Sequence, residues 1–398
     1  MKLRLSWGQL GNQAGIGLYD HYQYINIGGT YPFGNSNNPL KVPNASLGAM
    51  PAVDRTWETI ETYNAGIDFA TLNNRLNSTF DYFIKDNKNM FYAEEFPTIL
   101  GTSAPSINGA HVRTNGWELT LNWKDKIGKV GYRIGFNLSD NKTKVISLSD
   151  SRNPGHGLMG FVEGYPTNSF FIYEFDGFIK DEADLADYKA KMKGGVPTNL
   201  RVGDAKYIDK DGDGVLEPTL YKEGDPNSGD IVYKGTNNQR YLYGINLGLD
   251  WKGIDVSVFL QGVGKWDCIN GTYAGGGEVW KQSSQYFYHN TWSPDRPNAE
   301  YPRLTQDGGI HGYNYQWSDA PYKFFNNRYL RLKEVQIGYT FPTTLTKKIG
   351  VEKLRVYATG MNLLEWDNLP NGFDPEAPYT ENLIPFSRTY SIGVNVQF

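Results

Sequence analysis

The residues best suited to chemistry lie in one short run of acids and glycines between 209 and 217. Acidic residues occupy positions 1, 3, 5 and 9 of this run, and glycine occupies position 6. Carboxylate oxygens at this spacing converge on one point, and the glycine permits a sharp turn, as in a calcium-binding loop. We therefore predict that Ca²⁺ is bound by Asp209, Asp211, Asp213, the backbone carbonyl of Val215, and Glu217.

The predicted calcium loop is incomplete at its end. Position 12, where a bidentate acid normally completes the ligand set, is Leu220. Glu223 or Asp225 could take this place if the loop bulges. The alternative is an acidic, solvated turn without metal. Nothing nearby resembles the paired helices of a calcium switch, so we expect the ion to be structural and not regulatory.

A second group of candidate residues is aromatic and lies in the long connection over 265–327. Its rings are interspersed with Asn, Gln, Asp and Arg. Flat rings bordered by polar groups suit sugar rings, and they also suit peptides and protein partners. For any single ring, packing within the loops is the simpler alternative. The candidates for contact with a ligand or partner are Trp280, Tyr286, Tyr288, Trp292, Tyr313 and Trp317.

Signatures of catalysis are absent from the sequence. It contains no nucleophile elbow, no His-Glu-x-x-His zinc motif, and no phosphate- or dinucleotide-binding motif. The 5 histidines are scattered, and no pair of acids has a spacing that singles it out for glycosidase chemistry. The single cysteine, Cys268, excludes an internal disulfide and a cysteine-rich metal site. We expect that the protein is not an enzyme and holds no organic cofactor.

Composition indicates that strands and glycine-rich loops position these residues. Of the 398 residues, 15% are aromatic and 45 are glycine, which favours strands and turns. With 39 Lys+Arg against 43 Asp+Glu, the net charge of −4 argues against a nucleic-acid partner. No apolar run reaches the ~18 residues of a transmembrane helix, whereas the half-apolar strands of a membrane barrel fit the composition.

Strict alternation of apolar and polar residues predicts about ten β-strands. These segments are 2–11, 58–72, 76–92, 114–125, 130–145, 241–252, 253–264, 328–341, 354–362 and 388–398. A change of phase between Leu332 and Val335 predicts a β-bulge. One helix is expected over 181–193, because acids come first, bases come last, and two glycines follow.

The connections between the predicted strands alternate between short and long. The short ones are 73–75, 126–129, 252–253 and 342–353, and the long ones are 12–57, 93–113, 146–240, 265–327 and 363–387. Soluble domains rarely carry several long loops, whereas outer-membrane barrels have short turns at one end and long loops at the other. We predict an antiparallel transmembrane β-barrel over a soluble sandwich. Its lipid-facing surface would carry Trp117, Trp123, Tyr241 and Trp251.

Several motifs resemble the SusC/RagA-type TonB-dependent outer-membrane transporters of Bacteroidetes, and they follow the family's order. The segment 2–13 resembles the family's mid-barrel signature, and 203–207 followed by 211–214 resembles its loop motif. Segments 243–247 and 259–264 resemble the adjoining hairpin, and 354–364 with 372–376 resemble the last one. The terminal Phe398 is similar to the aromatic residue that such proteins present to the barrel-assembly machinery.

The resemblance covers essentially the whole chain, 1–398, and implies the C-terminal part of a larger transporter, with about ten of ~22 barrel strands. The signal peptide, TonB box and plug of that family are absent from this sequence. The resemblance implies uptake of oligosaccharides or peptides across the outer membrane with a SusD-like surface lipoprotein. TonB would act through the missing N-terminal part. The alternative function is a soluble or surface carbohydrate-binding β protein without transport.

Overall fold

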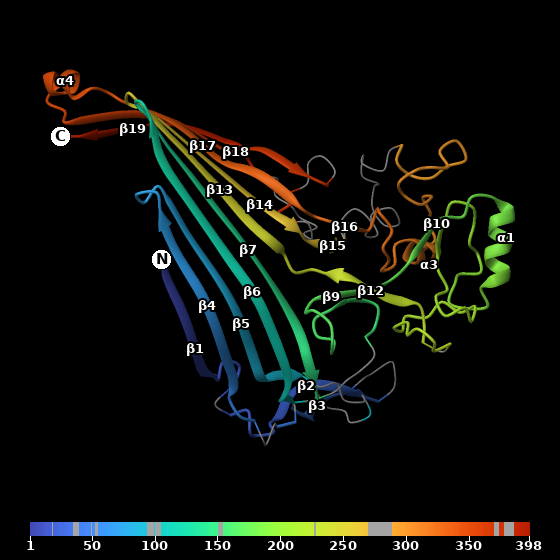
Figure 1. Ribbon diagram of the computed structural model, residues 1–398. Coiled ribbons are helices and arrows are strands. Elements are labelled where there is room, and N and C mark those ends of the chain that lie inside the picture. The colour runs from blue at the N-terminus through green and yellow to red at the C-terminus, as the bar shows by residue number, and fades with distance from the viewer. Residues whose placement is uncertain are drawn as a thin grey trace.

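The computed structural model describes residues 1–17, 19–34, 40–48, 50–51, 55–93, 99, 105–149, 154–226, 228–269, 289–369, 374–377 and 386–398. Its main element is an antiparallel sheet of 10 strands (Figure 1). In spatial order these are β1 (Lys2–Asn12), β4 (Glu58–Thr71), β5 (Leu76–Ala93), β6 (Ser106–Ile127), β7 (Val130–Leu148), β13 (Arg240–Trp251), β14 (Ile254–Lys265), β17 (Tyr329–Thr340), β18 (Lys353–Asp367) and β19 (Thr389–Gln397). All ten predicted strands are present, which confirms the all-β antiparallel fold.

β6 and β18 extend furthest beyond their predicted bounds, and one irregularity lies where it was expected. β6 begins at Ser106 because its pairing with β5 continues beyond a register shift near Met90. β18 ends at Asp367, which pairs with Tyr329. The register between β17 and β18 shifts between Leu332 and Glu334, which confirms the predicted bulge.

The register gives the sheet one apolar and one polar face, because alternate residues of a strand point to opposite faces. One cross-strand row on the apolar face consists of Leu76, Trp123, Ile134, Leu247, Val258 and Val335. The adjacent row on the polar face consists of Asn77, Asn122, Gly135, Asn246, Phe259 and Glu334.

The apolar face of the sheet is open to its surroundings. Leu5 is 75% exposed, Ile337 is 54% exposed and Ile392 is 82% exposed, although they belong to strands at the two edges and in the interior of the sheet. None of the four aromatic residues predicted for this surface is buried. The described elements therefore do not cover this face as the second sheet of a soluble sandwich would.

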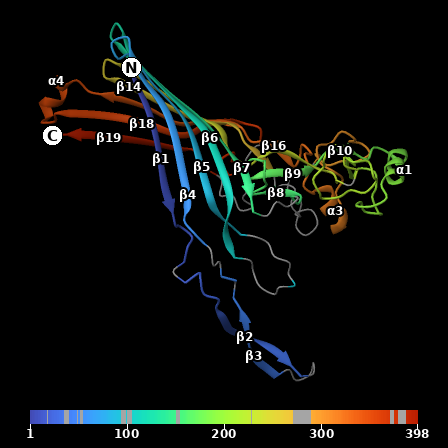
Figure 2. The same cartoon turned by 60° about the horizontal axis from the view of Figure 1, so that its bottom comes forward.

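The long connections gather at one end of the sheet and the short turns at the other, and both chain ends lie on the short-turn side (Figure 1). The short-turn end carries α4 (Thr343–Thr346) and a 3-10 helix, Lys347–Ile349. At the other end, the hairpin of β2 (Ile25–Phe33) and β3 (Leu40–Leu47) projects away from the sheet (Figure 2). No helix among the described residues is long and apolar enough to cross a bilayer.

Residues 154–236 and 289–327, here called the loop module, contain most of the buried core. The elements in and beside this module are β8 (Gly157–Met159), β9 (Ser169–Tyr173), β10 (Phe175–Phe178), α1 (Glu182–Lys191), β11 (Ala205–Tyr207), β12 (Ile231–Thr236), β15 (Asp267–Ile269), α3 (Gly308–Asn314) and β16 (Phe324–Asn326). Helix α1 is the predicted helix, and the Asp181 carboxylate caps it by accepting from the N–H groups of Ala183 and Asp184. Leu185 and Tyr188 bury its inner face.

Candidate functional site

The three predicted aspartate ligands come together in the structure. One carboxylate oxygen each from Asp209, Asp211 and Asp213 lies within 4.8 Å of the other two. The backbone wraps around Asp209, whose oxygens accept hydrogen bonds from the N–H groups of Gly212 at 2.9 Å and Gly214 at 2.8 Å. Both glycines have a positive φ, +82° and +88°, which a residue with a side chain rarely adopts. The sharp turn predicted from the glycines is therefore present.

The structure does not place the other two predicted ligands, Val215 and Glu217, in this group of carboxylates. The Glu217 side chain is exposed, and its carboxylate is not brought to the three aspartates. Its backbone N–H instead donates to the Asp230 carboxylate at 2.8 Å. Val215 donates its N–H to Asp213 at 2.6 Å and forms a parallel bridge with Gly194, beyond the end of α1.

Asp230 is a buried carboxylate that closes this loop, and it was not predicted from the sequence. Its side chain is fully buried and accepts from the backbone N–H groups of Lys210 and Glu217. Burial raises the pKa of Asp230, the two N–H groups oppose this, and the charges of Asp209 and Asp211 raise the pKa further. Asp230 was missed because it lies well beyond the 12 positions of a standard calcium loop.

Residues 209–217, here called the aspartate loop, are tied to the rest of the loop module through Glu174, which follows β9. Lys210, the second residue of the loop, lies 2.5 Å from the Glu174 carboxylate, and Lys234 of β12 lies 2.7 Å from it. Lys234 also contacts Asp319 at 2.9 Å. The hydrogen bonds from Lys210 and Lys234 lower the pKa of Glu174, so its carboxylate stays charged as the pH falls.

The predicted aromatic contacts divide into three groups. Trp280, Tyr286 and Tyr288 lie outside the described residues. Trp292 and Trp317 are half-buried, and each ring lies directly against a glycine. A Cβ at Gly203 would come within 2.3 Å of the Trp292 ring, and one at Gly157 within 3.3 Å of the Trp317 ring. These two glycines provide the space that both indoles occupy, and neither contact could be predicted from the order of the residues.

Tyr313 lies inside the loop module rather than on its surface. It is 6% exposed, and its hydroxyl lies 2.8 Å from the hydroxyl of Tyr188 on α1. The Tyr207 hydroxyl donates to the carbonyl oxygens of Tyr313 at 2.9 Å and Asn314 at 3.2 Å. This position gives Tyr313 the packing role that was the alternative for every aromatic candidate.

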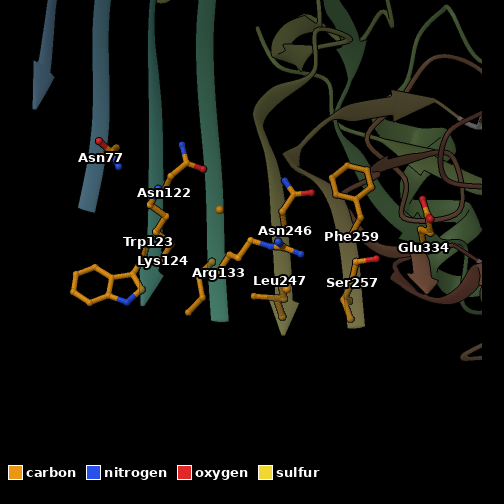
Figure 3. A pocket seen from close by; sticks show the side chains of 14 residues that line it. Asn77, Asn122, Trp123, Lys124, Arg133, Asn246, Leu247, Ser257, Phe259 and Glu334 are labelled. Carbon is orange, nitrogen blue, oxygen red and sulfur yellow. The ribbon is translucent and has the colours of Figure 1, made fainter. Parts of the chain in front are cut away.

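A hollow of about 880 Å³ lies on the polar face of the sheet, and we call it the polar-face hollow (Figure 3). Its polar-face lining spans β5 to β17 and comprises Asn77, Asn122, Lys124, Arg133, Gly135, Asn246, Gly248, Ser257, Phe259 and Glu334. Asn246 of β13 and Phe259 of β14 are cross-strand partners in this lining, and Figure 3 shows them on adjacent strands. These residues were not predicted as a site, because alternation identifies a polar face but not where it is hollowed.

Comparisons with known proteins agree with the geometry of the sheet. No protein-family model matches the chain. TonB-dependent receptor P3 of Formosa agariphila is 26% identical over 369 residues, which cover 86% of this chain and 34% of the relative. TonB-dependent receptor SusC of Bacteroides thetaiotaomicron is 25% identical over 429 residues, covering 100% of this chain and 37% of SusC. The solved RagAB peptide importer in its open-open state has a TM-score of 0.72 at 22% identity, covering 100% of this chain and 40% of the solved chain.

These similarities confirm the resemblance to SusC/RagA-type TonB-dependent transporters, and the solved structure confirms the fold. The chain spans 34% of the length of one curated relative and 40% of another. The matched proteins are named as receptors and importers and not as enzymes, in agreement with the prediction that this chain is not an enzyme.

Proposed function

We propose that this chain forms the C-terminal part of the barrel wall in a TonB-dependent importer of the outer membrane. Its apolar face contacts lipid, its polar face lines the lumen, and the loop module lies on the cell surface. Further strands of the transporter pair with β1 and β19, which are the outermost strands of the described sheet. Such pairing is required because an open sheet edge in lipid leaves backbone groups without hydrogen bonds.

The observation that carries this proposal is the exposed apolar face. A ten-stranded sheet whose Leu, Ile and Val rows face outward is stable only if a bilayer or another apolar partner covers them. The loop module, in contrast, has a buried core of its own. The connections are long at one end of the sheet and short at the other, which supports placing the loop module on the cell surface.

The cargo in this proposal is an oligosaccharide or a peptide, and a SusD-like lipoprotein captures it above the loop module. TonB acts through a part of the transporter outside this sequence. The similarity to the RagAB peptide importer supports the peptide class. The resemblance of the sequence motifs to the SusC/RagA family supports the oligosaccharide class and the lipoprotein. The chain itself carries out no covalent chemistry.

A transport assay tests the proposal. Cells with and without the gene for the full-length transporter are given oligosaccharide and peptide pools, and the loss of each solute from the medium is measured. We expect uptake that depends on the transporter and stops when TonB is deleted. Equal depletion by both strains, or extraction of the transporter from cells without detergent, would contradict the proposal.

The proposal also includes a Ca²⁺ ion held by the aspartate loop. Asp209, Asp211 and Asp213 offer oxygen ligands of the type that Ca²⁺ prefers, and the buried charge of Asp230 lies beside them. Four carboxylates in one small region repel each other, and a divalent cation offsets that repulsion. In this arrangement Asp230, and not Glu217, completes the acidic surroundings of the ion. Its role is to hold the loop against the rest of the loop module.

A further inference from the structure

We propose that Lys142 and Lys144 of β7, together with Arg113 of β6, bind the phosphate group of a lipid headgroup in the outer leaflet of the membrane. We call these three residues the basic rim cluster. This inference rests on the proposed function, because it places the apolar face of the sheet in lipid. It goes further by assigning a lipid-binding site to the edge of that face.

The apolar face changes in composition, row by row, toward the end of the sheet that carries the long connections (Figure 1). Leu119 of β6 lies in an apolar row with Phe80 and Leu138. In the next row of the same face, Trp117 pairs with Tyr82, which is 43% exposed. Aromatic rings of this kind mark the level of the lipid headgroups in membrane barrels. The apolar rows therefore end at the height where the headgroups begin.

The basic rim cluster lies on the same face, in the two rows beyond these rings. Asn115 pairs with Lys142 in the first row, and Arg113 pairs with Lys144 in the second. The two lysines are about 6.6 Å apart along β7, and directly opposite residues of neighbouring strands are about 5 Å apart. Long lysine and arginine side chains span such separations, so one phosphate group can accept hydrogen bonds from all three residues.

Other basic residues beside the aromatic rings already have acidic partners. Lys88 of β5 lies 2.5 Å from the Glu61 carboxylate. Arg240, at the start of β13, pairs with Asp140. A residue paired in this way has little charge left to attract a further anion.

The two lysines of the cluster have no such partner. Both are exposed, and neither forms an ion pair with a described residue. Asp86, in the same cross-strand row as Arg113, is engaged by Arg113 at 2.8 Å and by the His111 ring at 2.8 Å. Arg113 uses Nε and Nη2 for this pair, which leaves Nη1 for a ligand. The three cations exceed the single carboxylate, so this part of the rim carries an excess of positive charge.

The chemistry and the height of the cluster together indicate a phosphorylated lipid. A phosphate monoester carries about −1.5 to −2 charge near pH 7 and offers strong acceptor oxygens, which match an excess of lysine and arginine. The apolar rows directly below the cluster provide a surface for acyl chains. A lipid can therefore place its chains on these rows while its phosphate contacts the cluster, which a soluble anion cannot do.

Reconstitution of the full-length transporter into lipid nanodiscs tests this inference. The nanodiscs contain phosphatidylcholine with a small fraction of phosphatidic acid, whose headgroup is a phosphate monoester. Native mass spectrometry then counts the lipids of each kind that the transporter retains. The variants are Lys142→Gln, Lys144→Gln and the double variant.

The matched control is Lys85→Gln. Lys85 pairs with Thr114, and the other partner of Thr114 is Thr143, which lies between the two lysines. Lys85 therefore lies at the height of the cluster but on the polar face of the sheet. It is exposed and forms no ion pair with a described residue, as is the case for the two lysines.

We expect the wild type and Lys85→Gln to retain phosphatidic acid in preference to phosphatidylcholine. Each single lysine variant should lose about fivefold of this preference, which corresponds to ~1 kcal/mol per basic residue near a membrane surface. An unchanged preference in the double variant overturns the inference, and so does an equal loss in Lys85→Gln.

Two further outcomes separate this inference from the proposed function. Inorganic phosphate titrated into the detergent-purified transporter should not bind measurably, and binding that the double variant abolishes would assign the cluster to soluble anions and overturn the lipid assignment. A transporter that enters nanodiscs but shows no lipid preference overturns only this inference. A transporter that stays in solution and does not enter nanodiscs refutes the proposed function itself.

Discussion

Thr120 and Leu121 are neighbours on β6, and their side chains lie on opposite faces of the sheet. Thr120 pairs with Thr79 and Asn137 in a row on the polar face. Leu121 pairs with Ser78 and Phe136 in a row on the apolar face. Because the two residues are adjacent in the chain, a difference in stability between charged substitutions at these positions indicates a difference between the surroundings of the two faces.

We predict that Leu121→Arg destabilises the full-length transporter in a bilayer by ~2–4 kcal/mol, because it places a charge in lipid. Thr120→Arg should change stability by about 0.5 kcal/mol or less, since its side chain faces water. Unfolding in urea from lipid vesicles measures both values. Similar losses for the two variants would be inconsistent with a lipid-facing apolar side.

Calcium should stabilise the loop module. At a free Ca²⁺ concentration 100 times the Kd, bound ion adds about 2.7 kcal/mol to the stability of the region that holds it. Hydrogen exchange of residues 205–231 in the full-length transporter should therefore slow in Ca²⁺ compared with EGTA. Asp211→Asn should abolish the difference. Glu300→Gln, an exposed acid elsewhere in the loop module, should retain it. Equal hydrogen-exchange rates in the wild type with and without Ca²⁺ would show that the loop is an acidic turn that binds no ion.

Acid should loosen the loop module through Glu174. The hydrogen bonds from Lys210 and Lys234 lower the pKa of Glu174 in the folded state, and the one from Lys210 has the larger effect. The stability from these contacts is therefore present above the ordinary glutamate pKa and is lost as the pH falls through the lowered folded value. Proteolysis of the loop module between about pH 6 and 3 should accelerate in the wild type. Glu174→Gln should be cleaved faster at pH 6 and show a weaker pH dependence, whereas Glu223→Gln should behave as the wild type does.

The hydroxyl of Tyr207 should be essential for the packing of α3. Tyr207 is 1% exposed and donates to two carbonyl oxygens at the end of that helix. Tyr207→Phe leaves these buried acceptors with fewer donors, which should cost the loop module about 1–3 kcal/mol. Hydrogen exchange of residues 308–315 measures this loss. Tyr233→Phe is the control, since Tyr233 is 38% exposed and its hydroxyl bonds to no described residue. Equal exchange in Tyr207→Phe and wild type would assign no role to the hydroxyl.

How well each element could be predicted depended on how regular its pattern is. The ten long strands alternate along most of their length because each has one apolar and one polar face, and α1 has acids, bases and glycines at the expected positions. β9 was not predicted because all of its residues are buried, so its sequence does not alternate between apolar and polar residues. α3 spans only 7 residues and begins with two glycines, which are poor helix formers.

The candidate sites show the same division between local and distant signals. Asp209, Asp211 and Asp213 converge because they are close in sequence, and this could be predicted. Asp230 joins them only through the path of the chain after Gly229, whose N–H donates to Asp211 at 3.1 Å. The polar-face hollow depends on the register of several strands, which alternation within any one strand does not define.

The most direct test of the central claim is a spin-label scan of β13 in the full-length transporter reconstituted in lipid bilayers. Labels at residues 245–250 are examined for contact with oxygen, which is concentrated in lipid, and with a water-soluble nickel complex. We predict strict alternation, with Ile245, Leu247 and Leu249 accessible to oxygen and Asn246, Gly248 and Asp250 shielded from lipid. Uniform accessibility along these six positions, or protection of the leucines from lipid, would contradict a membrane-spanning barrel wall.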